Sequence, residues 1–178
     1  MNHDDHVALL RDGIHKSSGV WADLGSGRGA FTLALADLLS ARSTIYSIDR
    51  DKNSLGFLRR EFVVRYPNIC LHTIVDDFNH LLQLPKLDGI VMANSLHFQT
   101  NQLHTLHLAY NYLKPSGRFL LVEYNICQGN FAVPYPVSFN AWSSLAERVG
   151  FVDTHLIFTR PSSTFGEIYS ACSRKPIE

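Results

Sequence analysis

The residues most able to do chemistry lie near the start of the chain, where one acid precedes three glycines. Asp23 ends an apolar approach, Gly25, Gly27 and Gly29 follow at every second position, and an apolar-periodic run begins at Ala30. This order predicts a strand, a tight turn and a helix whose free N–H groups point into the turn. Glycines allow positive φ there and let a ligand approach the main chain with no Cβ in the way.

Two ligand classes compete for this turn. Gly25, Gly27 and Ala30 satisfy the G-x-G-x-x-A pattern of dinucleotide-binding turns, so an NAD-dependent oxidoreductase is one interpretation. Asp23 argues against it, because a carboxylate two residues before the first glycine would repel a pyrophosphate. The same carboxylate fits S-adenosylmethionine (SAM), which carries an α-ammonium group and a sulfonium cation.

A second acid, Asp49, ends the apolar, β-branched segment 44–49. Its interval from Gly25 is typical of a carboxylate that accepts hydrogen bonds from both ribose hydroxyls of a bound nucleoside. The alternative is that Asp49 caps a helix that begins near Asp51. In the first interpretation, Arg50 or Asp51 would flank the adenine.

Two further acids, Asp76 and Asp77, directly follow the predicted strand 71–75 and precede Phe78. An acid and an aromatic ring at the carboxyl end of a strand fit adenine, because the carboxylate can accept a hydrogen bond from the exocyclic amine. We favour Asp77 for this contact. The alternative is that one of the two acids caps a short helix around residues 81–82.

Two more predicted strands deliver polar residues to the same edge of the sheet, where ligands bind in open α/β folds. Asn94 ends one strand, Glu123 lies near the end of the next, and His97 lies in the loop after Asn94. His97, Glu123 and Tyr135 are candidates for a general base. Each has a structural alternative: hydrogen bonding within the loop for His97, a structural acid for Glu123 and core packing for Tyr135.

The rest of the chain predicts the elements that position these residues. The segment 126–136 is irregular and rich in aromatic residues, which is typical of a lid or a substrate wall. Periodicity and breakers predict strands at 19–24, 44–49, 71–75, 87–94 and 118–124, a hairpin of 151–159 with 165–173, and helices within 1–18, at 30–39, at 52–66, from Thr100 and around Trp142.

Composition limits the classes of function. The chain has 178 residues, 46% of them hydrophobic, which fits one domain spanning residues 1–178. A net charge of zero leaves no excess of positive charge to attract DNA or an anionic membrane. Cys70, Cys127 and Cys172 are scattered, which fits reduced thiols and a cytoplasmic location. His104 and His107 share a helix face but have no evident third ligand, so we expect no metal site.

The predicted elements form five strand–helix units followed by a terminal hairpin. They imply a three-layer Rossmann-like sandwich with a seven-stranded sheet, parallel except for the last strand. The chain resembles the class I SAM-dependent methyltransferases over nearly its whole length. The resemblance is carried by the glycine turn after Asp23, Asp49, the pair Asp76–Asp77, the strand from Asp88 to Asn94 and the segment Leu113-Lys114-Pro115-Ser116-Gly117-Arg118.

The resemblance implies a methyltransferase that moves a methyl group from SAM to a small molecule, or to a protein side chain, by in-line displacement. It also implies a set of cofactor contacts. Asp23, Gly25, Ser26 and Gly27 would hold the methionyl part, Asp49 the ribose with Arg50 beside it, Asp77 and Phe78 the adenine, and the backbone of Asn94 would lie near the sulfonium.

The sequence disfavours one class of acceptor and leaves two questions open. The strand that ends at Asn94 lacks an Asn-Pro-Pro-aromatic motif, which disfavours methylation of DNA bases or glutamine. A protein of this fold that binds SAM or a partner without transfer remains a second interpretation. The acceptor site is either open or completed by the loop 126–136 or by the second subunit of a homodimer.

Overall fold

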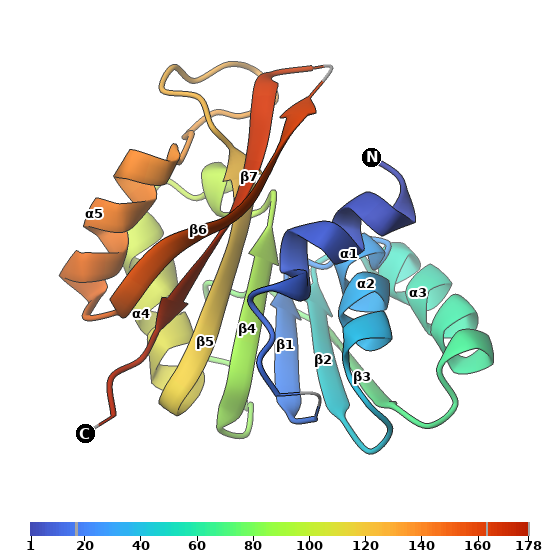
Figure 1. The fold of residues 1–178 in the computed structure, drawn as a ribbon. Helices are drawn as coiled ribbons and strands as arrows, with labels where there is room; N and C mark the ends of the chain where they lie inside the picture. Colours follow the sequence, from blue (N-terminus) through green and yellow to red (C-terminus); the bar gives the residue numbers. More distant parts are fainter. Residues whose placement is uncertain (17, 163, 178) are drawn as a thin grey trace.

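A seven-stranded sheet forms the centre of the computed structural model, which describes residues 1–16, 18–162 and 164–177 (Figure 1). The strand order is β3-β2-β1-β4-β5-β7-β6. β1 therefore lies in the middle of the sheet, and the strands that follow it in the chain are added first on one side, as β2 and β3, and then on the other, from β4 onward. The strands are β1 (Val20–Leu24), β2 (Thr44–Asp49), β3 (Cys70–Val75), β4 (Leu87–Ala93), β5 (Leu113–Tyr124), β6 (Val152–Ser162) and β7 (Gly166–Arg174).

The strand directions agree with the sequence-based prediction. β1 pairs in parallel with β2 and β4, β2 with β3, and β4 with β5, whereas β7 runs antiparallel to both β5 and β6. The parallel strands therefore end at one common edge, which we call the carboxyl edge. The prediction of a Rossmann-like sheet, parallel except for the last strand, is confirmed.

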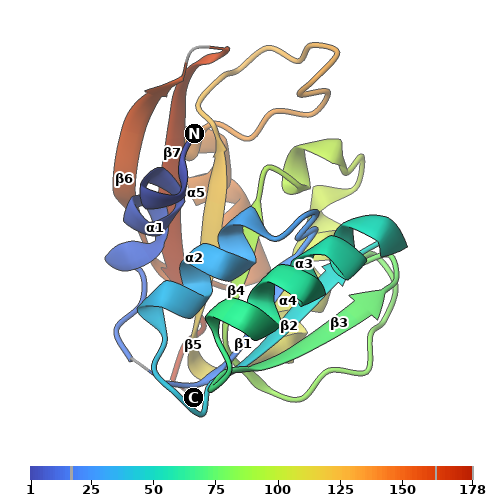
Figure 2. The same cartoon turned by 90° about the vertical axis from the view of Figure 1, so that its right-hand side faces the viewer.

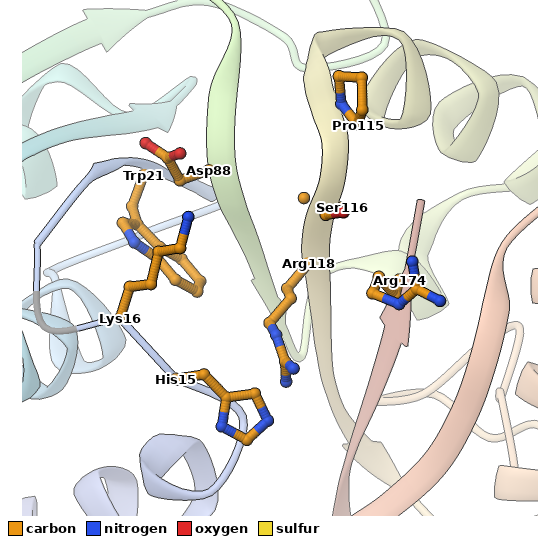
Figure 3. A pocket seen from close by; sticks show the side chains of 9 residues that line it. His15, Lys16, Trp21, Asp88, Pro115, Ser116, Arg118 and Arg174 are labelled. Atoms are coloured by element: carbon orange, nitrogen blue, oxygen red, sulfur yellow. The ribbon is translucent and has the colours of Figure 1, made fainter. Parts of the chain in front are cut away.

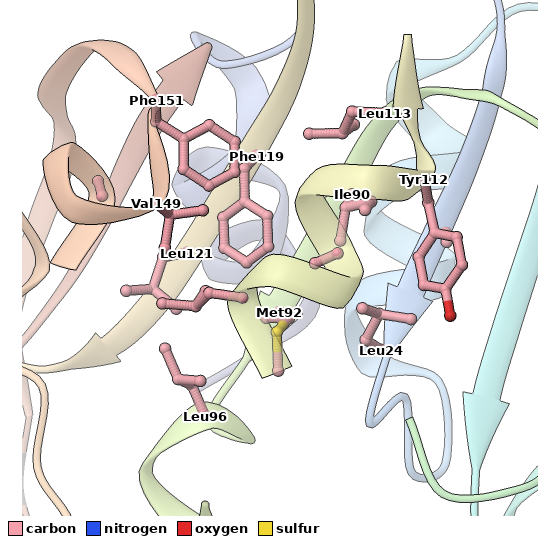
Figure 4. Close-up of a cluster of buried hydrophobic side chains, with 14 of the residues drawn as sticks. Leu24, Ile90, Met92, Leu96, Tyr112, Leu113, Phe119, Leu121, Val149 and Phe151 are labelled. Atoms are coloured by element: carbon pink, nitrogen blue, oxygen red, sulfur yellow. The ribbon is translucent and has the colours of Figure 1, made fainter. Parts of the chain in front are cut away.

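Helices cover both faces of the sheet (Figure 2). The side chains of α1 (His3–Arg11), α2 (Ala30–Leu38) and α3 (Lys52–Arg65) pack into one apolar cluster, which includes Leu10, Leu35 and Leu58. Those of α4 (Gln102–Tyr112) and α5 (Phe139–Val149) pack into a second cluster on the other face. Figure 4 shows part of this second cluster, in which Met92, Phe119 and Leu121 lie against Val149 and Phe151.

The amino-terminal helix lies within residues 1–18 as expected, whereas two other local predictions were wrong. The helix ends at Arg11, and Gly13 then passes so close to β5 that an added Cβ would lie 2.5 Å from Leu120 Cδ2. No helix forms around residues 81–82, because Leu82 donates its N–H to Tyr112 Oη instead of to a helical carbonyl. β5 begins at Leu113, five residues earlier than the predicted strand at 118.

Among the described residues, no helix combines the length and the apolar character needed to cross a membrane.

Candidate functional site

The glycine turn forms as the sequence predicts. Gly25, Gly27 and Gly29 have φ values of 83°, 52° and 88°, in the left-handed region that other residues adopt at a cost. The N–H groups of Gly25 and Ser26 both donate to Ile48 O, at 2.9 and 3.0 Å, which ties the turn to the end of β2. Gly29 then precedes α2, whose first residue is Ala30.

Asp49 connects this turn to the next segment of the chain. Its Oδ2 accepts from Gly27 N at 2.7 Å and its Oδ1 accepts from Asp51 N at 2.8 Å. The helix after it is capped by Asp51, which accepts from Asn53 N and Ser54 N. The capping alternative for Asp49 is therefore wrong, and its carboxylate oxygens keep lone pairs for further donors.

A cavity of about 210 Å³ opens at the carboxyl edge, above the ends of β1, β2 and β4. Five of its lining residues were predicted from the sequence, and three more come from the segment directly after β4. The predicted residues are Gly25, Asp49, Arg50, Phe78 and Asn94, and the additional ones are Ser95, Phe98 and Gln99. The signal that could have found the additional residues is their position directly after Asn94, in the segment 95–99 that leaves the carboxyl end of β4.

Asn94 lines the cavity and carries an unsatisfied side-chain acceptor. It adopts φ 50°, which is uncommon for a residue other than glycine, and its side-chain Oδ1 is buried with no hydrogen-bond partner among the described residues. Gly27 faces open space, because a Cβ there would have no atom within 4 Å. At Gly25, by contrast, a Cβ would lie 2.6 Å from Ser95 Cβ.

Asp23 lies beneath the turn and does not line the cavity. Its side chain is 1% exposed, and its Oδ2 accepts a hydrogen bond from Thr32 Oγ1 at 2.6 Å. Burial raises the pKa of Asp23 to about 7, with a further rise from the nearby Asp49 carboxylate, although the hydrogen bond from Thr32 acts in the opposite direction. The buried carboxyl group therefore titrates near neutral pH and would ionise more readily beside a cationic ligand.

The acids proposed for adenine lie just outside the cavity. Asp77 Oδ1 accepts from Asn79 N at 2.9 Å, and its Oδ2 lies 3.5 Å from Arg50 Nη1. Asp76 Oδ1 accepts from Asp77 N and from His80 Nδ1, at 2.7 and 3.1 Å. Both acids thus stabilise a turn, whereas the adjacent Phe78 ring lines the cavity. Ser26 is also outside the lining, with a buried Oγ that has no partner among the described residues.

A buried contact between His97 and Glu123 lies beside the cavity, and His97 belongs to the 3-10 turn η1 (Leu96–Phe98). His97 Nδ1 lies 2.5 Å from Glu123 Oε2, and the two side chains are 3% and 0% exposed. Glu123 Oε1 also accepts from the N–H groups of Leu96 and His97, at 3.1 and 3.2 Å. Glu123 thus fixes both the imidazole and the backbone of the segment that carries Phe98 into the cavity.

Tyr135 reaches the same segment from the loop 126–136. Its N–H donates to His97 O at 3.0 Å, and its carbonyl accepts from Gln102 Nε2 at 2.9 Å. Its side chain is 45% exposed, so the core-packing alternative is wrong. The structure therefore brings the side chains of His97 and Glu123 together, and it joins Tyr135 to His97 through the backbone.

A sequence comparison decides the family. A family model described as a methyltransferase domain matches residues 15–155, most of the chain and all of the site described above. The chain belongs to the methyltransferase domain family. The expected methyltransferase activity is confirmed at the level of the family, and no curated protein sequence matches the chain.

Solved structures share the fold of this methyltransferase at low sequence identity. A SAM-dependent methyltransferase from Aquifex aeolicus is 16% identical, with a TM-score of 0.75 over 96% of this chain and 89% of that chain. The 1,6-didemethyltoxoflavin-N1-methyltransferase of Burkholderia thailandensis is 17% identical, with a TM-score of 0.77 over 98% and 78%. Human N-acetylserotonin methyltransferase is 19% identical, with a TM-score of 0.71 over 97% and 52%.

The residues of the methyltransferase cavity fit SAM. The unpartnered Asn94 Oδ1 and the Asp49 carboxylate match a ligand with hydroxyl donors, and the buried Asp23 carboxyl group beneath the turn can supply negative charge near its cationic groups. The open space at Gly27 gives that ligand access to the main chain. Nothing in this set of residues calls for a ligand that carries a pyrophosphate.

Substitution of Gly27 by Val is expected to weaken cofactor binding strongly, at some cost in stability. The new side chain would enter open space, but φ of 52° is strained for a β-branched residue, and the branches would occupy the ligand's path. Calorimetric titration with S-adenosylhomocysteine should show at least a 100-fold loss of affinity. Retained affinity would mean that the ligand does not approach this turn.

Proposed function

We propose that this methyltransferase transfers the methyl group of SAM to a small-molecule acceptor in the cytoplasm. The observation that carries the proposal is the cavity of about 210 Å³ beside the buried His97–Glu123 pair. Phe98, Tyr135 and Phe131 expose aromatic surface near this edge, which fits a compact acceptor better than a charged polymer. The net charge of zero and the free Cys70, Cys127 and Cys172 support the absence of a DNA substrate and the cytoplasmic location.

Each part of the cofactor has residues that would hold it. Asp49 would accept from the ribose hydroxyls, with Arg50 at the rim, and Phe78 would pack against the adenine, with Asp77 behind it. Gly25, Ser26 and Gly27 would present the turn to the methionyl part, with Asp23 as the buried counter-charge and Asn94 near the sulfonium. When bound, SAM supplies an electrophilic methyl group together with its leaving group.

His97 would remove the acceptor's proton when the acceptor is an alcohol or an amine that keeps it. The contact with Glu123 Oε2 occupies Nδ1, so proton transfer would use Nε2, which has no hydrogen-bond partner among the described residues. Glu123 itself would orient the imidazole without touching the acceptor. Because the His97 side chain is almost fully buried, the loop 126–136 would have to shift to admit the acceptor.

A pair of histidine variants tests this assignment. His97→Gln is expected to lower kcat by about 100-fold or more for acceptors that keep their proton, since general bases contribute roughly 10²–10⁴-fold. The affinity for S-adenosylhomocysteine should change less than twofold. His107→Gln, at an exposed position of α4, is the matched control and should leave kcat unchanged. A purely structural role would instead lower stability and cofactor affinity together in His97→Gln.

A protein side chain as acceptor, and SAM binding without transfer, are the alternatives to a small-molecule acceptor. An assay with methyl-labelled SAM, purified protein and panels of small molecules and peptides separates them. We expect labelled product in the small-molecule panel. Label in the peptides would reassign the acceptor, and tight SAM binding with no product in either panel would favour the binding protein. The expected homodimer is a separate prediction, and light scattering of the purified protein tests it.

A further inference from the structure

A second cavity, also of about 210 Å³, lies at the opposite edge of the sheet from the cofactor cavity (Figure 3). Its walls come from the connector after α1, from the first residues of β1 and β4, from the amino-terminal half of β5 and from the last residue of β7. Nothing in the proposed methyl transfer uses this cavity. Segments far apart in the sequence thus converge on a hollow of ligand size.

Cationic side chains outnumber acidic ones in the walls of this cavity. Lys16, Arg118 and Arg174 line it together with the His15 imidazole, and Asp88 is the single acid in the lining. The excess is local, because the whole chain carries no net charge. In Figure 3 the guanidinium of Arg118 lies between His15 and Arg174, so these side chains face a common space.

Two of the charged groups in this cavity already have partners. Asp88 Oδ2 accepts from Val20 N at 2.8 Å and from Lys114 Nζ at 2.9 Å. Although partial burial acts to raise it, the pKa of Asp88 is held below its usual value by these hydrogen bonds, so this acid stays ionised. Arg174 Nε donates to Asp153 Oδ2 at 2.8 Å. The charge of Lys16 also helps to lower the pKa of Asp88, so Arg118 is the lining cation that no carboxylate partners within the described residues.

Arg118 is held in place with donors to spare. Its Nη1 lies 3.3 Å from Gly13 O and 3.5 Å from Cys172 Sγ, which fixes the guanidinium plane. Within residues 1–16, 18–162 and 164–177, no carboxylate lies within ion-pair distance of Arg118 or Lys16, and Arg118 Nε and Nη2 have no acceptor. A partly buried guanidinium without an anion is unfavourable, and its fork of donors matches an oxyanion.

We propose that this cavity binds a small molecule that carries an oxyanion, either a phosphate or a carboxylate. Arg118 is its main contact, Lys16 supplies a second, flexible cation, and the hydroxyl of Ser116 lines the same space. The buried indole of Trp21 forms an apolar wall, against which the uncharged part of the ligand packs. The ligand is therefore anionic at one end and apolar at the other.

Nuclear magnetic resonance titrations of the full chain test this proposal, with inorganic phosphate in one arm and benzoate in the other at constant ionic strength. We expect saturable shifts of amides that line this cavity and not of those around Asn94. Stronger binding of phosphate or of benzoate identifies which oxyanion the ligand carries. Shifts that grow linearly with salt, or that centre on the cofactor cavity, would overturn the proposal.

Matched variants assign the contact. Arg118→Gln is expected to weaken binding about tenfold or more, because it removes charge-assisted hydrogen bonds. Lys16→Gln, at an exposed position where the fold is not at risk, should weaken it severalfold. Arg42→Gln is the control, since Arg42 lies exposed in the turn before β2, outside the cavity. If the Arg118 and Arg42 variants weakened binding equally, the proposed contact with Arg118 would be contradicted.

Discussion

Replacing Asp49 by Ala is expected to weaken SAM binding by at least 100-fold. The carboxylate holds Gly27 N at 2.7 Å, and we assign it both ribose hydroxyls, so the substitution removes the sugar contacts and loosens the turn. Hydrogen bonds to charged groups contribute roughly 1.5–3 kcal/mol each, and two of them exceed the 2.7 kcal/mol or so that 100-fold requires. Calorimetric titration with SAM and S-adenosylhomocysteine measures the loss.

Asp51→Ala provides the control for this measurement. Asp51 is the neighbouring exposed acid and caps α3 through Asn53 N and Ser54 N. Its loss should cost about 1 kcal/mol of stability and little cofactor affinity. If Asp49→Ala and Asp51→Ala reduced affinity equally, the ribose would have to lie elsewhere.

Replacing Asp23 by Asn is expected to stabilise the unliganded protein above pH 7 while weakening SAM binding. Burial raises the pKa of Asp23 to about 7, whereas in the unfolded chain it is near 3.9. The folded state therefore binds the proton more tightly, and the stability that this provides is lost as pH rises from about 4 through 7. At about 1.4 kcal/mol for each unit of pKa, the ionised carboxylate costs up to about 4 kcal/mol at pH 8.

Urea unfolding at pH 5 and pH 8 checks this expectation. The free energy of unfolding of the wild type should fall between these two pH values, and that of Asp23→Asn should fall less. The variant should also lose cofactor affinity, because a neutral amide no longer attracts the ammonium group. Parallel pH dependences of the two proteins would show that Asp23 is not the group that titrates.

The parts of this fold that follow from local rules were predictable. The alternation of apolar strands with amphipathic helices predicted the bounds of β1 to β4 to within one residue at each end. Asp23 and the glycines after it predicted the position of the turn. Asp49 could be assigned because the tip of β2 lies beside that turn in a parallel sheet. These features depend on sequence neighbours and on one general topological rule.

Other features depend on contacts between distant residues, which the sequence does not display. Leu82 N donates to Tyr112 Oη across 30 residues, so no helix forms where Asp76 or Asp77 would have capped one. The full burial of Asp23 depends on Thr32 and on the packing of α2 over the sheet. The pairing of His97 with Glu123 depends on the register of β4 and β5, so the sequence could propose both residues but not their contact.

A crystal structure with S-adenosylhomocysteine tests the central claim most directly. We predict that the ribose hydroxyls donate to Asp49, that the adenine lies against Phe78, and that the sulfur faces Asn94 at the carboxyl edge. A nucleoside bound anywhere else, such as in the cavity beside Arg118 at the opposite edge, would contradict the account.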